Sequence, residues 1–349
     1  MKKFVFAALI MAIFMMLLAG CGKNAPSQTS QAQKKQTITI VDEENRAVEV
    51  PCPPERIACL SPSVAEVICA LGEAGKIVAR GDDAAFPPVL QEKPSVGTTQ
   101  AVNIERLLAQ KPDVVVLRAG TLTKPEIMEK IEAAGIPVVK FWSIELDTVL
   151  PMIEQMGKML NKEAKAAELA GFIQKYQETV EKRLANLKTE EKPQVFFQTM
   201  GHMHMTNSGD TAGHRRIVAA GGRNIAADEK VRTPQVSAEW VLERNPDVIV
   251  HSYMKASKTI NPPSPEELKK LREEIMSEPG LKKTKAVKNN RVYVIDTRLI
   301  TGPRSVVGLL YFAKWFHPEL FKDIDPAAVH REMLKRFYNL EVDGSWVYP

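Results

Sequence analysis

The sequence predicts an α/β protein with two Rossmann-like lobes, each built on a parallel-type sheet, and a single long helix between them. Three observations predict this fold. Short apolar segments alternate with segments of helical periodicity in both halves of the chain. The middle segment 162–187 has helical periodicity only. A helix–turn–strand motif near residue 105 recurs near residue 239.

The first half alternates strand and helix from Thr37 onward. Ser61 and Pro62 are typical of a helix start, and Gly72 is typical of a helix end. Because the later strands are short and almost wholly apolar, we expect a parallel sheet covered on both faces. The expected strands are 38–41, 47–50, 56–60, 76–80, 114–117 and 138–141, the first two as a hairpin, and the expected helices are 61–71, 104–110 and 125–134.

The middle of the chain predicts the linking helix. Segment 147–187 has no strand pattern, and we expect one break in it, near Gly157. Its apolar residues recur at steps of three and four, which places them on one helical face: Leu169, Ile173, Tyr176, Val180, Leu184 and Leu187. A helix over 162–187 would have about 26 residues and a length of roughly 39 Å. That length exceeds an ordinary crossover helix.

An internal repeat relates the two halves. Segment 102–116 recurs 134 residues later as segment 236–250, with Val, Glu, Leu, Pro, Asp and the final valine run in register. Each copy predicts a short helix, a Pro-Asp turn and a buried strand. Such units are common in α/β proteins, but the shared Glu105 and Glu239 favour two similar lobes. Further expected elements are strands at 194–199, 248–251 and 291–295 and a helix at 210–220.

The first 36 residues predict export and anchoring. Lys2 and Lys3 precede an apolar run, 4–18, that is too short to span a membrane and is typical of a secretory signal. The run ends in Leu-Ala-Gly-Cys21, which resembles the lipobox of bacterial lipoproteins. An ordinary signal peptide with a chance cysteine is the alternative. We therefore expect a signal peptide at 1–20, a flexible tether at 21–36, an N-terminal lobe at 37–147, a linking helix at 148–190 and a C-terminal lobe at 191–349.

Composition restricts the function further. A formal net charge of +5, evenly spread, gives no indication of nucleic acid as a partner. If Cys21 carries lipid, three cysteines remain. A Cys52–Cys59 or Cys52–Cys69 disulfide is open in an oxidising compartment, and buried thiols are the other interpretation of Cys59 and Cys69. Their spacing matches no zinc site.

Several motifs, in their order around the long helix, resemble the periplasmic binding proteins for iron–siderophores, haem and cobalamin. The resemblance covers about residues 37–340. Its carriers are the segment starting at Pro54 and running through Ser61-Pro-Ser to Val67, Asn103-Ile-Glu-Arg-Leu, Lys111-Pro-Asp-Val, Ala219-Ala-Gly-Gly-Arg-Asn-Ile-Ala, Val236-Ser-Ala-Glu and Gly302-Pro-Arg. The resemblance implies a non-enzymatic, lipid-anchored, extracytoplasmic binding protein of an ABC importer, with no intrinsic cofactor. Its implied partners are a metal-chelate ligand, such as haem or an iron–siderophore complex, and a permease dimer with its ATPase.

The same resemblance implies how the protein docks. Each lobe of such a protein presents a carboxylate to the permease, which makes Glu105 and Glu239 the expected docking pair. Two like charges on rigid lobes would steer and orient the encounter. Both glutamates also lie in a first helical turn, where they would stabilise the helix dipole. Ser63 and Glu66 fit a capping box instead, so we expect Glu66 to be structural.

The ligand is expected between the lobes, at the carboxyl ends of the strands. Loops after the strands supply the candidates. Those of the first half are Arg80, Asp82, Asp83, Thr99 and Arg118, and those of the second half are Met200, His202, His204, Arg232, His251, Tyr253 and Arg298. Arginines could hold propionates or siderophore acids with two hydrogen bonds each, although a charged rim would look the same.

Three of the six histidines follow expected strands, which suggests contact with a metal. His202 and His204 point the same way in an extended segment, and His251 completes the set. Cobalamin binders line such loops with aromatic residues, whereas this chain has Asp83 and Thr99 there, which argues against cobalamin. The histidines and methionines favour a ligand whose metal is touched directly. Cobalamin or a bare metal ion remains the alternative. A surface metalloenzyme that uses the three histidines lacks any supporting motif. A sensor subunit of the same fold stays open.

Overall fold

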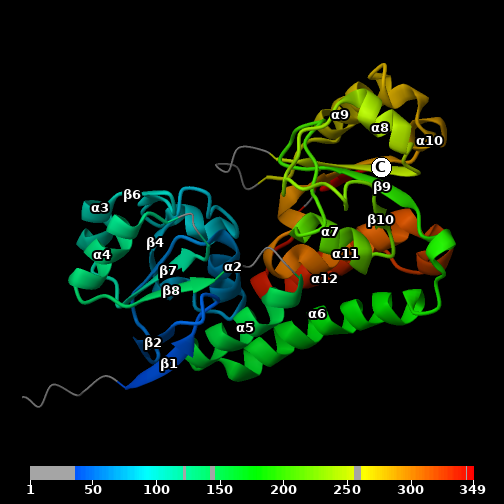
Figure 1. Cartoon of the computed structure of the whole chain (residues 1–349). Helices are drawn as coiled ribbons and strands as arrows, with labels where there is room; N and C mark the ends of the chain where they lie inside the picture. The colour runs from blue at the N-terminus through cyan, green and yellow to red at the C-terminus, as the bar shows by residue number, and fades with distance from the viewer. Residues whose placement is uncertain (1–35, 121–122, 142–145, 255–260, 343) are drawn as a thin grey trace, which may run out of the picture. The chain divides into compact units, whose positions relative to one another are not determined.

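A computed structural model describes residues 36–120, 123–141, 146–254, 261–342 and 344–349 (Figure 1). The segment Gln36–Pro349 forms one compact unit. Cys21 therefore lies outside the described residues. In the described part of the chain, none of the helices combines the length and apolar character that crossing a bilayer requires.

The N-terminal lobe is built on a four-stranded parallel sheet in the order β4-β3-β7-β8. An antiparallel hairpin of β1 and β2 precedes it, and the short strands β5 and β6 pair beside it. The strands are β1 Thr37–Val41, β2 Ala47–Pro51, β3 Ile57–Cys59, β4 Ile77–Arg80, β5 Gly97–Thr98, β6 Ala101–Val102, β7 Val114–Arg118 and β8 Val138–Phe141. The helices are α2 Pro62–Ala70, α3 Ile104–Ala109 and α4 Pro125–Ala133, with 3-10 turns η1 Ala74–Lys76 and η2 Pro88–Glu92.

The C-terminal lobe contains a five-stranded sheet in the order β10-β9-β11-β12-β13. All its neighbours are parallel except β13, which pairs antiparallel with β12. The strands are β9 Gln194–Gln198, β10 Arg223–Asn224, β11 Val248–Tyr253, β12 Val292–Asp296 and β13 Val347–Tyr348. The helices are α7 Ala212–Ala219, α8 Ala238–Arg244, α9 Pro265–Ser277, α10 Lys285–Lys288, α11 Ser305–Phe316 and α12 Pro326–Tyr338, with 3-10 turns η3 Thr189–Glu191, η4 Leu281–Lys283, η5 Thr297–Leu299, η6 Gly302–Arg304 and η7 Pro318–Phe321.

Two helices lie between the sheets of the lobes, and the longer of them bridges the lobes. The helix α5, Leu146–Leu160, packs against α6, Glu163–Leu184, and α6 runs on toward the C-terminal lobe (Figure 1). The predicted long helix is confirmed as α6, although it is shorter than expected, with 22 residues and a length of roughly 33 Å. The break near Gly157 was wrong. The chain turns at Asn161 instead, and Gly157 is needed because any side chain there would overlap Ala166 of α6.

Alternating residues of the central strands face different cores. In β7, Val114 and Val116 join a core that continues through α5 and α6 into the C-terminal lobe, whereas Val115 and Leu117 face a core of the N-terminal lobe alone. In β11, Val250 faces the shared core and Ile249 a separate one. Both sheets are therefore covered on both faces, as their apolar strands predict. The predicted fold class of two α/β lobes bridged by one long helix is confirmed.

The lobes also meet through a buried ion pair that the sequence did not predict. Glu66 of α2 accepts hydrogen bonds at 2.7 Å and 3.0 Å from Arg304, which follows β12 in the other lobe. Tyr338 of α12 donates a third hydrogen bond to Glu66, at 3.2 Å. The side chains of Glu66 and Arg304 are only 6% and 3% exposed. Glu66 is structural, as expected, but the capping box was wrong, because α2 begins after Ser61 and has no side-chain cap.

Candidate functional site

The predicted residues of the N-terminal lobe gather at the carboxyl ends of β3, β4 and β7. Arg80 and Arg118 are the last residues of β4 and β7, and Asp82 and Asp83 follow Arg80 after one intervening residue, Gly81. Thr99 lies beside the end of β3, where its hydroxyl donates to the carbonyl of Leu60 at 3.2 Å. This edge is the one at which parallel sheets bind ligands.

Burial and neighbouring charges have opposite effects on the pKa values of this group. Burial raises the pKa of Asp83, while Arg118 and Arg80 act in the opposite direction. Burial also lowers the pKa of Arg118, against the effect of Asp83. Arg80 donates to the carbonyl oxygens of Gly81 and Asp82, at 2.8 Å and 3.2 Å, which fixes its guanidinium over the loop. The result is a set of two arginines and two carboxylates, half-buried except for the exposed Asp82, that could bind a polar, charged ligand group.

In the C-terminal lobe the loop after β9 carries Met200, His202 and His204. Met200 is 51% exposed and has a positive φ of 55°, and His202 is exposed. His204 contacts Glu278, since its Nε2 lies 3.0 Å from a carboxylate oxygen of that residue. The extended conformation expected for His202 and His204 is wrong, because the loop is a series of turns.

His251 is held inside the lobe by Gln198. Its Nδ1 lies 3.0 Å from the Gln198 amide oxygen, and the residue is 1% exposed. Within the described ranges, three or more His, Cys, Asp or Glu side chains do not come together in a group that could hold a metal ion. His202, His204 and His251 thus do not form the three-histidine metal site that the sequence suggested.

The other predicted residues of this lobe are placed as follows. Arg232 is exposed, and its carbonyl accepts from the Ser208 amide at 3.0 Å. The Tyr253 hydroxyl donates to Glu267 at 3.4 Å. Arg298 follows β12, and its guanidinium forms two hydrogen bonds with Asp296, at 2.9 Å and 2.7 Å. Because Asp296 already holds Arg298, a ligand acid would have to compete for that guanidinium.

The two repeated elements match in their hydrogen bonds as well as in their residues. Asn103 and Ser237 cap α3 and α8 by accepting from the amide three residues later, at 2.9 Å and 3.2 Å. Glu105 and Glu239 are the second residues of these helices, and both are exposed. The two helices lie along the same side of the compact unit (Figure 1). The pKa of Glu239 is lowered by hydrogen bonds to its own backbone amide and to Ser237, so its carboxylate stays ionised.

The aspartates of the Pro-Asp turns also correspond. Asp113 accepts from the amides of Glu55 and Arg56, just before β3, and Asp247 accepts from the amide of Gln194 at the start of β9. Each aspartate therefore fixes the start of the neighbouring strand in its own sheet. The repeat is a real structural duplication of helix, turn and strand.

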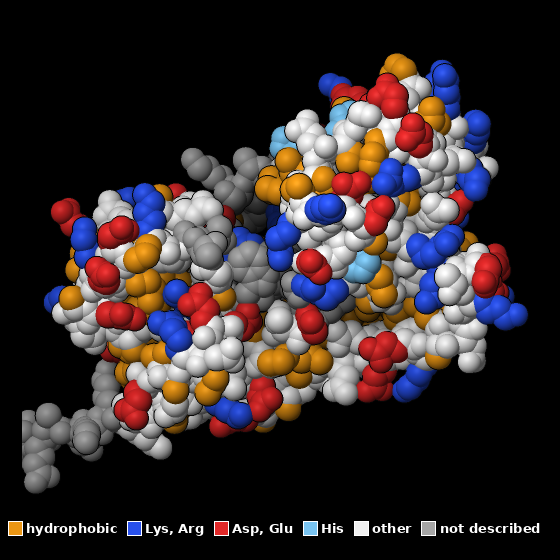
Figure 2. Space-filling view, in the orientation of Figure 1, with side chains coloured by type: hydrophobic (Ala, Val, Ile, Leu, Met, Phe, Trp, Pro, Cys, Tyr) orange, Lys and Arg blue, Asp and Glu red, His pale blue; other side chains and the backbone are white. Residues whose placement is uncertain are grey.

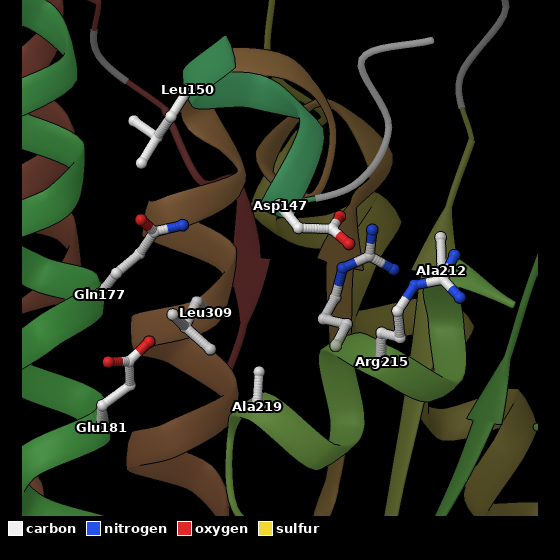
Figure 3. A pocket seen from close by; sticks show the side chains of 9 residues that line it. Asp147, Leu150, Gln177, Glu181, Ala212, Arg215, Ala219 and Leu309 are labelled. Carbon is white, nitrogen blue, oxygen red and sulfur yellow. The ribbon is translucent and has the colours of Figure 1, made fainter. Parts of the chain in front are cut away.

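A pocket of about 360 Å³, which no sequence pattern indicated, lies between α5, α6, α7 and α11 (Figure 3). Asp147 points toward the arginine side chains of α7, while Gln177 and Glu181 of α6 face Leu309. The lining residues are Asp147, Leu150, Gln177, Glu181, Ala212, Arg215, Arg216, Ala219 and Leu309. They come from four separate segments, so only the fold brings them together. The predicted loop residues do not line this pocket.

Comparison with known proteins gives the class. Residues 57–299 match the family described as "Periplasmic binding protein", and the chain belongs to that family, whose members are ABC substrate-binding proteins. The prediction of a binding protein and not an enzyme is thereby confirmed.

Three individual proteins show what the chain is similar to within this class. The chain is 27% identical over 327 residues to the uncharacterized ABC transporter substrate-binding lipoprotein YvrC of Bacillus subtilis, covering 91% of this chain and 98% of the relative. It is 31% identical over 199 residues to a vitamin B12-binding protein of Yersinia pestis, covering 57% and 69%. The molybdate periplasmic binding protein MolA of Haemophilus influenzae has a similar fold, with a TM-score of 0.74, 21% identity, and coverage of 88% and 100%.

Acid should destabilise the fold through two buried histidines. Burial lowers the pKa of His251 to about 4 and that of His330 in α12 to about 3, below the ordinary value of about 6.5. Both are neutral when folded but gain protons in the unfolded chain, so the stability they contribute is complete above about pH 6.5 and is lost as the pH falls toward the folded values. At pH 5 we expect a loss of about 2 kcal/mol for each histidine, relative to pH 7.

Urea unfolding at pH 7 and pH 5 measures this loss. The variant His330→Phe keeps an aromatic ring against Trp346, whose ring centroid lies 5.2 Å from that of His330, and removes the titrating group. It should reduce the difference between the two pH values by about half. An unchanged midpoint in the wild-type protein at both pH values would contradict the assignment of these histidines as neutral.

Proposed function

We propose that this protein captures a metal chelate between its two lobes and delivers it to an ABC permease. The observation that carries the proposal is the matched arrangement of the lobes. The carboxyl ends of the N-terminal strands present Arg80, Asp83 and Arg118, and those of the C-terminal strands present exposed His202 and Met200. Acidic groups of a chelate would bind the arginines, and an imidazole or a thioether could reach its metal.

Haem or an iron–siderophore complex is the ligand that we propose first. His202 is the exposed histidine of the three, and the absence of a three-histidine group from the described residues argues against a bare metal ion. Cobalamin is the second candidate, since a relative with 31% identity is a vitamin B12-binding protein. Cobalamin binders stack aromatic side chains on the corrin ring, but the ring of Phe86 is already packed on Arg304 at the contact between the lobes. Its ring centre lies 4.1 Å from the guanidinium.

Export and anchoring complete the proposal. The segment 1–20 would act as the signal peptide, and Cys21 would carry the lipid that holds the protein at the outer face of the cytoplasmic membrane or on the cell surface. YvrC of Bacillus subtilis, which this chain matches over 98% of the relative's length, is described as a lipoprotein, and this supports the assignment. The partners are then the permease dimer with its ATPase, and the exposed pair Glu105 and Glu239 would contact the permease.

Titration of the purified protein with haem, ferric siderophores and cobalamin tests the ligand. We expect one of these chelates to bind with one-to-one stoichiometry and to be released chemically unchanged. Its absorbance should shift on binding if His202 touches the metal. The variant His202→Ala should then lose that shift, whereas His214→Ala, on α7, should retain it. Failure of all three chelates to bind would overturn the proposed ligand class, and binding without a shift would overturn the role of His202.

A further inference from the structure

A row of lysines lies on the outer edge of the C-terminal lobe, on η4 and α10. We call Lys282, Lys283, Lys285 and Lys288 the lysine edge. All four are exposed, and the segment 279–290 contains no Asp or Glu. The Nζ atom of Lys285 lies 3.6 Å from a carboxylate oxygen of Asp247, a half-buried residue of the neighbouring turn. Figure 2 shows Lys and Arg side chains along the edge of the molecule over α10.

The lysine edge is mounted rigidly. Leu281, Thr284 and Ala286 alternate with the lysines and are fully buried. The Thr284 hydroxyl donates to the Leu281 carbonyl at 2.7 Å, and the Lys285 amide donates to Asn245 at 2.9 Å. The charges are therefore held in a fixed row and do not lie on a loose loop.

The lysine edge lies beside the proposed docking helix. The turn η4 packs against α8, and a side chain at Gly280 would overlap Ala238, the residue before Glu239. A permease is embedded in the membrane. If Glu239 contacts the permease, the neighbouring lysines face the rim of that contact, where lipid headgroups lie.

The even spread of charge expected from the sequence was wrong, because the two lobes have net charges of opposite sign. Segment 37–147 has 11 Lys and Arg against 17 Asp and Glu, whereas segment 191–349 has 24 against 19. An anionic surface would thus repel the first lobe and attract the second. The attraction would be strongest at the lysine edge, where four cations are close together.

We propose that the lysine edge binds the anionic phospholipid headgroups around the permease. This proposal rests on the proposed function for the position of Glu239, but its chemistry is independent of the ligand. Lysine suits this role because its ammonium is a point charge that needs no fixed partner geometry. Each lysine close to an anionic bilayer should strengthen binding about fivefold, within a screening length of about 8–10 Å.

Vesicle sedimentation tests the proposal with a chain that starts at Gln36, the first residue of the compact unit. We expect it to bind phosphatidylcholine vesicles that contain phosphatidylglycerol, not to bind pure phosphatidylcholine vesicles, and to be released by high salt. Replacing all four lysines of the edge by glutamine should weaken binding at least tenfold. The matched control replaces four exposed lysines of the linking region by glutamine, with the same change of net charge: Lys165, Lys175, Lys182 and Lys188.

The outcomes separate this proposal from the proposed function. Equal binding to both vesicle types, or an equal loss in the control variant, overturns it, because net charge alone would then explain the result. If the lysine-edge variant binds anionic vesicles normally but binds permease in neutral nanodiscs poorly, the lysines contact the permease and the membrane proposal is wrong. The vesicle assay contains neither chelate nor permease, so its result does not depend on the ligand or on docking.

Discussion

Replacing Arg304 by leucine while Glu66 remains should lower the free energy of unfolding by about 3–5 kcal/mol. The Glu66 carboxylate would lose both hydrogen bonds from the guanidinium and would keep only the one from Tyr338. It would stay buried between the lobes without a counter-charge, and burial already raises its pKa. Denaturant unfolding followed by circular dichroism measures the loss.

The double variant Glu66→Met with Arg304→Leu removes both charges. It tests whether the loss of stability comes from leaving Glu66 buried without a partner. Because two apolar side chains of similar volume need no counter-charge, we expect most of the lost stability to return. As a matched control, Arg183 and Asp323 form an ion pair at 2.6 Å on the surface, and removing Arg183 should cost far less. If the double variant is no more stable than Arg304→Leu alone, the burial of unpaired charge is not the cause.

Glu105→Ala together with Glu239→Ala should lower chelate uptake in cells at least tenfold and leave chelate binding by the purified protein unchanged. Both carboxylates are exposed in the first turns of α3 and α8, and neither is one of the candidate ligand residues. Their loss should therefore affect the encounter with the permease and not the ligand. Each single variant should retain partial uptake, because the other lobe still presents its carboxylate.

Uptake of radiolabelled chelate by cells and titration of the purified protein are the two measurements. The control variant removes two exposed glutamates from other surfaces, Glu190 and Glu319, and should transport normally. Normal uptake by the double variant would remove the docking role from Glu105 and Glu239. A parallel fall in chelate affinity would place these residues at the ligand instead.

The sequence predicted the fold well because the fold depends on local patterns. Strands such as Val114–Arg118 and Val248–Tyr253 are short apolar runs, and the stripe on α6 is visible at steps of three and four. The repeat around Glu105 and Glu239 required only fifteen consecutive residues in each copy. The capping box predicted for Glu66 was wrong for the opposite reason. Its partner Arg304 lies 238 positions away, where no local pattern can show it.

The candidate site was predictable only in part. Parallel topology places every strand end at one edge, which is why Arg80, Asp83 and Arg118 do lie together. The direction of a side chain depends on partners that no local pattern shows. His204 contacts Glu278 and His251 contacts Gln198, so the three histidines do not form one metal-binding group although their positions suggested a cluster.

The two sheets take their strands from separate stretches of the chain, 57–141 and 194–348, and α6 carries the chain between them. A single genetic crossover within the codons of α6 would therefore exchange one whole lobe between related genes. The recombinant would keep both sheets intact, and its main condition would be a compatible pair at Glu66 and Arg304. Ligand preferences contributed by different lobes could in this way be combined over evolution without rebuilding either sheet.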